Sequence, residues 1–417
     1  MNSDMTQGVS RRSFMRILGA AGAAATSFPA FAAIEQAGTQ AAAPAAKPKL
    51  ARSAQFSPDT VIISANENPL GPAQSALTAI CSTASLGGRY HWDEYMKTIS
   101  VFNDQFGLKK DYSALYPGSS GPLDLALMSN IGPDKPLVYG DPSYEQGPRA
   151  ADTMKAQKFP VPLTATYAHD VKAMLKAHPS PGAYYIVNPN NPTGTMTPKA
   201  DIVWLVNNKP KGSVVIIDEA YHHFSNDESC IDLVTQDKDV IVMRTFSKIY
   251  GMAGIRAGFA IARPDLIERF NVVGGPSQSL ASTSITSAAA ARASLQDKDL
   301  VPLRKKINGD IRTETLAFLA KHGYKVVPGS QGNMFMVDVG RPGREFQASM
   351  LKENVAIGRT WSAMPNYVRV TVGTKAEMEK FQTAFVKCMD MPPGAANGAA
   401  AVHAPEFNIP TELYRLS

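Results

Sequence analysis

Short, uninterrupted apolar runs recur through the middle of the chain and alternate with segments of helical periodicity. The runs at 137–139, 183–187, 213–217 and 240–243 predict strands buried on both faces. Residues 198–207, between two of these runs, have the spacing of an amphipathic helix. Buried strands that alternate with helices predict a doubly wound, mostly parallel sheet of the α/β class.

A second set of elements follows near the C-terminus. A helical run at 303–322 leads to predicted strands at 324–327, 333–338 and 367–372, and a last helix at 375–389 closes the set. This order predicts a smaller α+β domain over residues 311–391, after an N-terminal segment and large domain over 58–310. Residues 392–417 are rich in Gly, Ala and Pro at first and have no evident periodicity, which indicates a tail.

The first 32 residues have the order of a bacterial export signal. Arg11 and Arg12 stand within Ser-Arg-Arg-Ser-Phe-Met-Arg, an apolar Ala/Gly stretch follows, and Ala-Phe-Ala at 30–32 is a small-residue cleavage site. A disordered basic tail is the alternative. The signal predicts export of the folded protein to the periplasm by the twin-arginine translocase, with no stable membrane span after cleavage. The Ala/Pro-rich residues 33–57 then read as a flexible leader.

Composition narrows the classes of partner. With 44% hydrophobic and 19% charged residues, the 417-residue chain has the composition of a globular protein. The formal charge is +6, of which +2 lies before residue 33 (three arginines against one aspartate), so the remainder predicts no nucleic-acid or membrane partner. The three cysteines are far apart and match no metal or disulfide spacing.

The first candidate for chemistry is Lys248. The apolar run at 240–243 leads through Thr245 and Ser247 to this lysine, and Arg256 lies eight residues beyond it. A lysine at the end of a buried strand is readily desolvated, which lowers its pKa and frees its amine as a nucleophile. Neighbouring hydroxyls and a guanidinium suit a phosphate. The hypothesis is a Schiff-base lysine beside a phosphate cup; the alternative is an ordinary lysine on a solvated loop.

Two further strand ends carry polar side chains. Asp218 and Tyr221 end the 213–217 run, and Asn191 follows the 183–187 run. A buried carboxylate can pair with a protonated pyridine nitrogen, and an amide and a phenol can hydrogen-bond a phenolate oxygen. The alternatives are a helix-capping aspartate and a simple Asn-Pro turn.

Other candidates would complete a site for a phosphorylated ring and an amino acid. Ser119 and Ser120 precede a predicted helix at 123–130, whose N-terminus suits a phosphate. Tyr144 follows the 137–139 run and offers a face for stacking. Arg359 and Arg369, in the smaller domain, can each bind a carboxylate at two points, although each alone reads as a surface arginine.

Together these segments resemble the fold-type-I pyridoxal-phosphate-dependent aminotransferases of class I/II, specifically the histidinol-phosphate aminotransferase-like branch. The resemblance covers about residues 58–390 and rests on an ordered set of motifs: Asn-Glu-Asn-Pro at 66–69, Asn-Asn-Pro-Thr-Gly at 190–194, Asp-Glu-Ala-Tyr at 218–221, Thr-Phe-Ser-Lys at 245–248 and Arg-Val-Thr-Val-Gly-Thr at 369–374. Pyridoxal 5'-phosphate is the cofactor that it implies, and no metal.

The resemblance implies a role for each candidate. Lys248, Asp218 and Tyr221 would be catalytic, with Lys248 as the Schiff-base lysine and the base that moves the Cα proton. The residues that would bind the cofactor are Ser119, Ser120, Tyr144, Asn191, Asp218, Tyr221, Thr245, Ser247, Lys248, Arg256 and, from the neighbouring subunit of a homodimer, Tyr90. The residues that would bind the substrate are Asn68, Arg359 and Arg369.

The chain departs from the family pattern at two of these places. The phosphate loop reads Gly-Ser-Ser-Gly at 118–121 where the family often has Gly-Ala-Asp-Glu, and Tyr90 is followed by His91 instead of proline. Backbone donors would survive the first change. The export signal is also unexpected for an enzyme of histidine biosynthesis, which argues against histidinol phosphate as the physiological substrate.

The leading expectation is an aminotransferase that moves an amino group between an amino acid, or a histidinol-phosphate-like amine, and a 2-oxo acid. One alternative keeps the cofactor and changes the reaction to that of an amino-acid oxidase, lyase or decarboxylase. Another is a cofactor-binding protein without catalysis.

Overall fold

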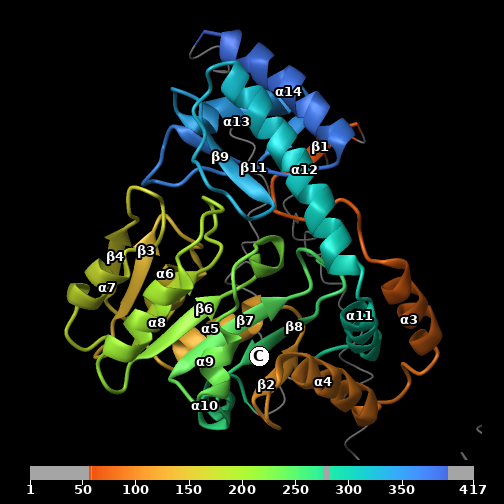
Figure 1. Ribbon diagram of the computed structural model, residues 1–417, viewed down its shortest axis with the longest axis vertical. Helices are drawn as coiled ribbons and strands as arrows, with labels where there is room; N and C mark the ends of the chain where they lie inside the picture. The colour runs from red at the N-terminus through yellow and green to blue at the C-terminus, as the bar shows by residue number, and fades with distance from the viewer. Residues whose placement is uncertain (1–55, 58, 276–281, 393–417) are drawn as a thin grey trace, which may run out of the picture. The chain divides into compact units, whose positions relative to one another are not determined.

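A seven-stranded sheet contains the predicted apolar runs (Figure 1). The structure, a computed structural model, describes residues 56–57, 59–275 and 282–392. Strands β3 to β7 are mutually parallel, whereas β8 is antiparallel to β7 and β2. The order across the sheet is β2 (Ser113–Tyr116), β8 (Gly258–Ile261), β7 (Val240–Thr245), β6 (Val214–Asp218), β5 (Ala183–Val187), β3 (Leu137–Asp141) and β4 (Lys158–Pro162). The predicted mostly parallel α/β fold is confirmed.

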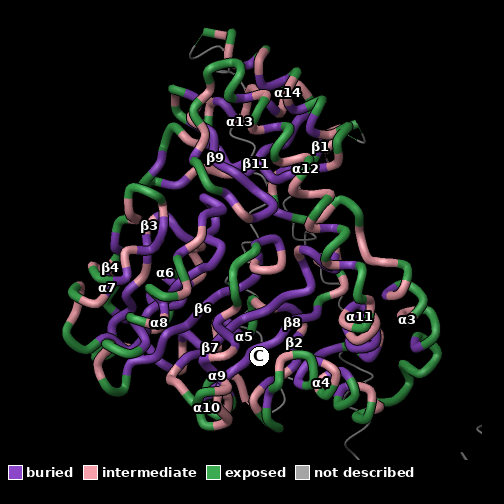
Figure 2. Tube along the Cα trace, in the orientation of Figure 1, coloured by how far each residue is buried: buried purple, intermediate pink, exposed green. Residues whose placement is uncertain are grey.

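The central strands are apolar at every position because both faces of the sheet are covered. In β6, Val214 and Ile216 belong to one core, and Val215 and Ile217 belong to the other. Helices on the first face are α5 (Ser120–Met128), α6 (Gln146–Thr153) and α10 (Pro264–Gly274). Residues in the second core come from α4 (Trp92–Phe106), α7 (Val171–Ala177), α8 (Lys199–Asn208), α9 (Ile231–Thr235) and α11 (Ile285–Gln296). α11 also packs on α3 (Gln74–Ala84). Buried residues accordingly run along these strands (Figure 2).

A third core lies among the C-terminal elements. It contains residues of β9 (Met334–Asp338) and β11 (Tyr367–Thr371), which pair antiparallel, together with residues of α13 (Gly343–Lys352) and α14 (Lys375–Asp390). The predicted strands at 333–338 and 367–372 are confirmed. The predicted strand at 324–327 is wrong, because only one bridge, Val326 to Val337, forms there. Pro328 has no N–H to extend that ladder.

The first ordered strand belongs with these C-terminal elements. β1 (Val61–Ile63) pairs in parallel with β10 (Val355–Ile357), and Val61 and Ile63 enter the third core. The sequence analysis placed this segment in one range with the large domain. The pairing of β1 with β10 corrects that placement. The alternation of buried and exposed residues in β1 follows from a strand with one buried face.

One long helix reaches from the sheet to the third core. In α12 (Leu300–Lys321), Leu300 packs in a core of the large sheet, and Leu319 packs in the third core with residues of β9 and α14. α12 also contacts the short η1 helix (His222–Phe224). The predicted boundary at residue 310 falls inside this helix. The predicted helix at 123–130 begins earlier, at Ser120, which places Ser119 at its N-cap.

Several expectations concern residues that are not described. The predicted signal at 1–32, almost all of the leader at 33–57 and almost all of the tail at 392–417 lie outside the described residues. Within the described part, no helix is both long and apolar enough to span a bilayer, and no cluster of acidic, His and Cys side chains is arranged to hold a metal.

The last helix, α14, begins with a capping motif whose contribution to stability can be tested. Thr374 Oγ1 accepts from the Glu377 amide at 3.3 Å, and Glu377 Oε2 accepts from the Thr374 amide at 2.6 Å, which is a reciprocal capping box. We expect Thr374→Ala to lower the free energy of unfolding by about 1 kcal/mol. The matched variant Thr374→Ser keeps the hydroxyl and should stay near wild type in urea unfolding. An equal loss in both variants would contradict a role for the cap.

Candidate active site

The candidate residues meet at one edge of the large sheet. Asp218 ends β6, Asn191 follows β5, and Lys248 follows β7, three neighbouring parallel strands. Because parallel strands end at the same edge, residues that are distant in sequence are brought to one place. β11 of the third core brings Arg369 to the same place, where its Nη1 donates to Asn191 Oδ1 at 2.7 Å.

Lys248 is held with its amine among protein atoms. Nζ donates to the Ala65 carbonyl at 3.3 Å and lies 5.4 Å from the centre of the Tyr221 ring. Burial of the amine lowers the pKa of Lys248 to about 8, and the nearby positive charge of Arg369 acts in the same direction. Part of the lysine surface stays accessible. A reagent can therefore reach an amine that is more often neutral than an ordinary lysine.

Asp218 is almost completely buried. It accepts hydrogen bonds from the Ala220 amide at 3.0 Å and from the Tyr185 hydroxyl at 3.4 Å. Burial raises the pKa of Asp218 to about 6, although those two hydrogen bonds oppose the rise. A cationic ring nitrogen beside this carboxyl would favour its ionised form.

Arg369 is buried and bound only to neutral groups. Its Nη1 donates to Asn191 and its Nη2 donates to the Ser64 carbonyl, while its Nε is buried with no hydrogen-bond partner. Burial lowers the pKa of Arg369 to about 10, with Arg359 contributing in the same direction. A buried donor without an acceptor is costly. The unpaired Nε of Arg369 therefore fits a site that receives an anionic group.

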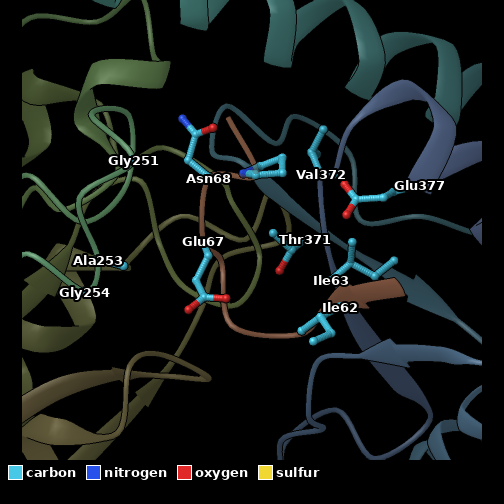
Figure 3. A pocket seen from close by; sticks show the side chains of 12 residues that line it. Ile62, Ile63, Glu67, Asn68, Gly251, Ala253, Gly254, Thr371, Val372 and Glu377 are labelled. Carbon is cyan, nitrogen blue, oxygen red and sulfur yellow. The ribbon is translucent and has the colours of Figure 1, made fainter. Parts of the chain in front are cut away.

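Asn66 is a site residue that sequence reasoning missed. Its backbone is left-handed, with φ at 53°, and its buried amide donates to the Tyr221 hydroxyl at 3.1 Å. The signal was present, since Asn66 begins the Asn-Glu-Asn-Pro motif. The predicted substrate residue, Asn68, instead donates to the Ile249 carbonyl at 3.0 Å. It lines a cavity of about 300 Å³ together with Glu67 (Figure 3).

The predicted phosphate cup is assembled around Arg256. Its Nη1 donates to Ser247 Oγ at 3.4 Å, and its Nη2 donates to the Pro117 carbonyl at 3.2 Å. The hydroxyl of Thr245 lies 2.9 Å from that of Ser247. Ser119, at the N-cap of α5, makes no side-chain capping bond, so the first N–H groups of the helix have no internal acceptor. The cup thus combines a guanidinium, hydroxyls and a helix N-terminus, as a phosphate requires.

Two glycines allow the walls of this cup to approach each other. Gly118 has φ at 89°, and a Cβ on it would lie 2.1 Å from Arg256 Nη2. A Cβ on Gly258 would lie 2.6 Å from the carbonyl carbon of Gly118. The first contact would displace the Arg256 guanidinium, and the second would displace the loop backbone at Gly118 and Ser119. These positions therefore require glycine.

Tyr144 and the second arginine lie on the other side of the site. Burial raises the pKa of Tyr144 to about 12, so its phenol stays neutral. Arg359 Nη2 forms an ion pair of 2.7 Å with Glu145 Oε2, and its Nε is buried without a partner. Trp361 packs against both guanidinium groups, at 5.0 Å from Arg359 and 5.4 Å from Arg369. Sequence reasoning missed Glu145 and Trp361, which belong to no motif.

Tyr90, like Asn68, does not join the other candidates in the described part of the chain. It is 65% exposed and stacks on Trp92, with ring centres 5.3 Å apart. Its predicted partner is a second subunit.

These observations fit pyridoxal phosphate. Glycine-dependent walls surround a donor set suited to a phosphate. A buried carboxyl and a buried amine of lowered pKa stand beyond the cup. Arg369 and Arg359 each keep a buried nitrogen without a partner.

The lowered pKa of Lys248 leads to a prediction. A neutral amine is the reactive form, and with a pKa of about 8 instead of 10.5 it is already abundant at pH 8. The rate of reductive methylation of Lys248 in the cofactor-free protein should therefore rise with pH and level off above about pH 9. Peptide mass spectrometry can follow this lysine beside exposed Lys306 as an internal control. Equal pH profiles for the two lysines would contradict the shift.

Known proteins are similar to this chain in sequence and in fold. A histidinol-phosphate aminotransferase of Nitrosococcus oceani is 32% identical over 327 residues, covering 77% of this chain and 86% of that protein. An aromatic amino acid aminotransferase of Cutibacterium acnes is 31% identical over 341 residues, covering 80% and 94%. The fold is similar to that of a Sinorhizobium meliloti histidinol-phosphate aminotransferase in complex with pyridoxal-5'-phosphate, with a TM-score of 0.72, 23% identity and coverage of 79% and 90%.

The family match spans most of the chain. The model of "Aminotransferase class I and II" matches residues 58–385. This match confirms the predicted fold and the predicted enzyme class. The cofactor in the Sinorhizobium meliloti structure is the one that the sequence predicts for this chain. The chain belongs to the class I and II aminotransferases.

Proposed function

We propose that the protein transfers the amino group of an amino acid to a 2-oxo acid at the site around Lys248. The observation that carries the proposal is the juxtaposition of Lys248, Asp218 and Arg369. Burial lowers the pKa of the lysine and raises that of the aspartate, and a buried arginine faces them. Titratable groups with opposed shifts in one site are typical of catalysis.

The residues around the sheet edge would hold the cofactor. Lys248 would bind it covalently through its amine, and Asp218 would pair with the ring nitrogen. Asn191 and Tyr221 would contact the ring oxygen, and Tyr144 would cover one face. When bound, pyridoxal phosphate supplies an electron sink that makes the Cα–H bond of an amino acid acidic.

The phosphate end would be bound by Arg256 and its neighbours. Arg256 supplies a fixed positive charge, and the hydroxyls of Thr245, Ser247, Ser119 and Ser120 supply donors. The N-terminus of α5 adds a favourable field for an anion.

Lys248 is also suited to move the proton. An amine with a pKa of about 8 is neutral often enough to accept a proton near neutral pH and can return it afterwards. Arg369 would orient the carboxylate of the substrate, since its Nε has no other acceptor among the described residues. Asp218 and Tyr221 are 4% and 6% exposed, so these two groups are shielded from water.

The second candidate function is a different reaction that uses the same cofactor. Residues that bind the cofactor are compatible with an amino-acid oxidase, lyase or decarboxylase, so the products decide. Formation of a 2-oxo acid with transfer of nitrogen to an acceptor supports transamination. Release of ammonia or carbon dioxide without an acceptor would support the second candidate.

Replacement of the lysine tests the proposal directly. We expect Lys248→Ala to lower transamination by at least about 10³-fold, because both the covalent anchor and the base are lost. The visible absorbance of the bound cofactor should also change. The control Lys306→Ala, on exposed α12 surface, should keep wild-type turnover. Full turnover in Lys248→Ala would contradict the assignment.

We infer further that the enzyme is a homodimer in which Tyr90 reaches the phosphate cup of the partner subunit. Support comes from the exposure of this phenol and of its stacking neighbour, Trp92, at 65% and 51%. Large aromatic rings that are this exposed are typical of interaction surfaces.

Export in the folded state is likewise a proposal. Its support is the Arg11-Arg12 motif and the small-residue site that ends at Ala32. The physiological donor would then be a compound present outside the cytoplasm, which argues against histidinol phosphate.

Fractionation of cells tests the export proposal. Replacing Arg11 and Arg12 together by lysine should leave the protein in the cytoplasm at its full precursor length, because the twin-arginine signal is no longer recognised. The matched variant Arg52→Lys, within the predicted leader, should still be exported. A periplasmic double variant would contradict the proposal.

A further inference from the structure

We propose that Glu145 is a specificity-determining residue that occupies Arg359 and makes the site select amino donors with an uncharged side chain. The inference rests on the proposed function, since it concerns which donor the aminotransferase accepts. It assigns a role to a residue that belongs to none of the recognised motifs.

The ion pair engages the key nitrogen of the guanidinium. Glu145 Oε2 lies 2.7 Å from Arg359 Nη2. A guanidinium binds an oxyanion at two points along either its Nε–Nη2 edge or its Nη1–Nη2 edge. Both edges include Nη2, so a distal phosphate or carboxylate that made a two-point contact with Arg359 would lie next to the Glu145 carboxylate.

The backbone fixes Glu145 beside the site. It directly follows Tyr144, the predicted stacking ring, and stands at the N-cap of α6. The arginine is fixed as well, because its Cζ lies 5.0 Å from the Trp361 ring, whose Nε1 donates to the Ser143 carbonyl at 3.0 Å. Glu145 and its partner therefore meet through elements that also build the site.

The two arginines differ in their charge balance. Arg369 contacts the neutral oxygens of Asn191 and Ser64, and no carboxylate forms an ion pair with it in the described part of the chain. Arg359 has the Glu145 carboxylate at 2.7 Å, and the same oxygen lies 3.5 Å from Nη2 of the half-exposed Arg149. Of the two arginines at the site, Arg369 is therefore the one whose charge has no carboxylate of the described residues in contact with it.

A donor with a second anionic group would meet a penalty here. Its distal phosphate or carboxylate would lie near Glu145, and the like charges would repel each other. The side chains of Arg359 and Glu145 are 27% and 35% exposed, so water and salt weaken the effect without abolishing it. An uncharged side chain meets no such penalty.

Glutamine and glutamate test this selection because they have the same shape and differ in charge. In the holoenzyme, single-turnover loss of the cofactor's visible absorbance gives kcat/KM for each donor. We expect wild type to prefer glutamine, and Glu145→Gln to move the ratio toward glutamate by about tenfold. The change should lie mainly in the apparent binding constant and shrink at high salt.

A double-mutant cycle separates this effect from a structural one. In an Arg359→Gln background, Glu145→Gln should change the ratio less than it does in wild type, because the arginine that it would release is absent and only the direct repulsion by Glu145 is removed. The matched control Glu228→Gln alters an 84% exposed glutamate paired with Lys199 and should leave the ratio at the wild-type value.

The outcomes are distinct. A wild-type preference for glutamate, or an unchanged ratio in Glu145→Gln, would overturn the inference while leaving transamination intact. Absence of a half-reaction with every amino acid tried would instead overturn the proposed function, and the inference with it.

Discussion

The active site depends on one constraint, the register of three parallel strands that end at the same edge. Val187 of β5 pairs with Asp218 of β6, which in turn pairs with Met243 of β7. The polar residues that follow each strand are therefore placed side by side. A shift of one residue in any strand would turn its polar end toward the opposite core. Because these strands are apolar on both faces, the polar residues at their ends distinguish the correct register from a shifted one.

Burial at this edge has an unfavourable consequence for the protein itself. An amine and a carboxyl that are removed from water lose hydration, which lowers the pKa of Lys248 and raises that of Asp218. The folded cofactor-free protein thus contains groups that reduce its stability. A bound cofactor with a cationic ring nitrogen and an aldehyde would compensate both groups, so binding and stability are linked.

The C-terminal elements provide the part of the site that recognises the substrate. β11 pairs with β9 and presents Arg369, whereas Arg359 follows β10. Contacts from Arg369 to Asn191, from Arg359 to Glu145 and from Trp361 to Ser143 join these elements to the loops after β3 and β5. The cofactor site and the substrate site are therefore built by different sets of strands. Changes in one set, such as Glu145 near Arg359, can alter donor choice without altering the cup.

The sequence by itself predicted the fold class, the positions of the main strands along the chain and a set of candidate residues for the cofactor site. It did so because burial on both faces leaves continuous apolar runs, and because polar residues at the ends of parallel strands must converge. Only the tertiary structure decided the rest. The small-residue loop at 118–121 was recognised, but the need for glycine at Gly258 comes from a segment distant in sequence. Asn66, whose backbone is left-handed, donates to Tyr221, whereas the predicted substrate residue Asn68 donates to Ile249. β1 joins β10 across almost 300 residues, and Glu145 meets Arg359 across more than 200, through contacts that no local pattern encodes.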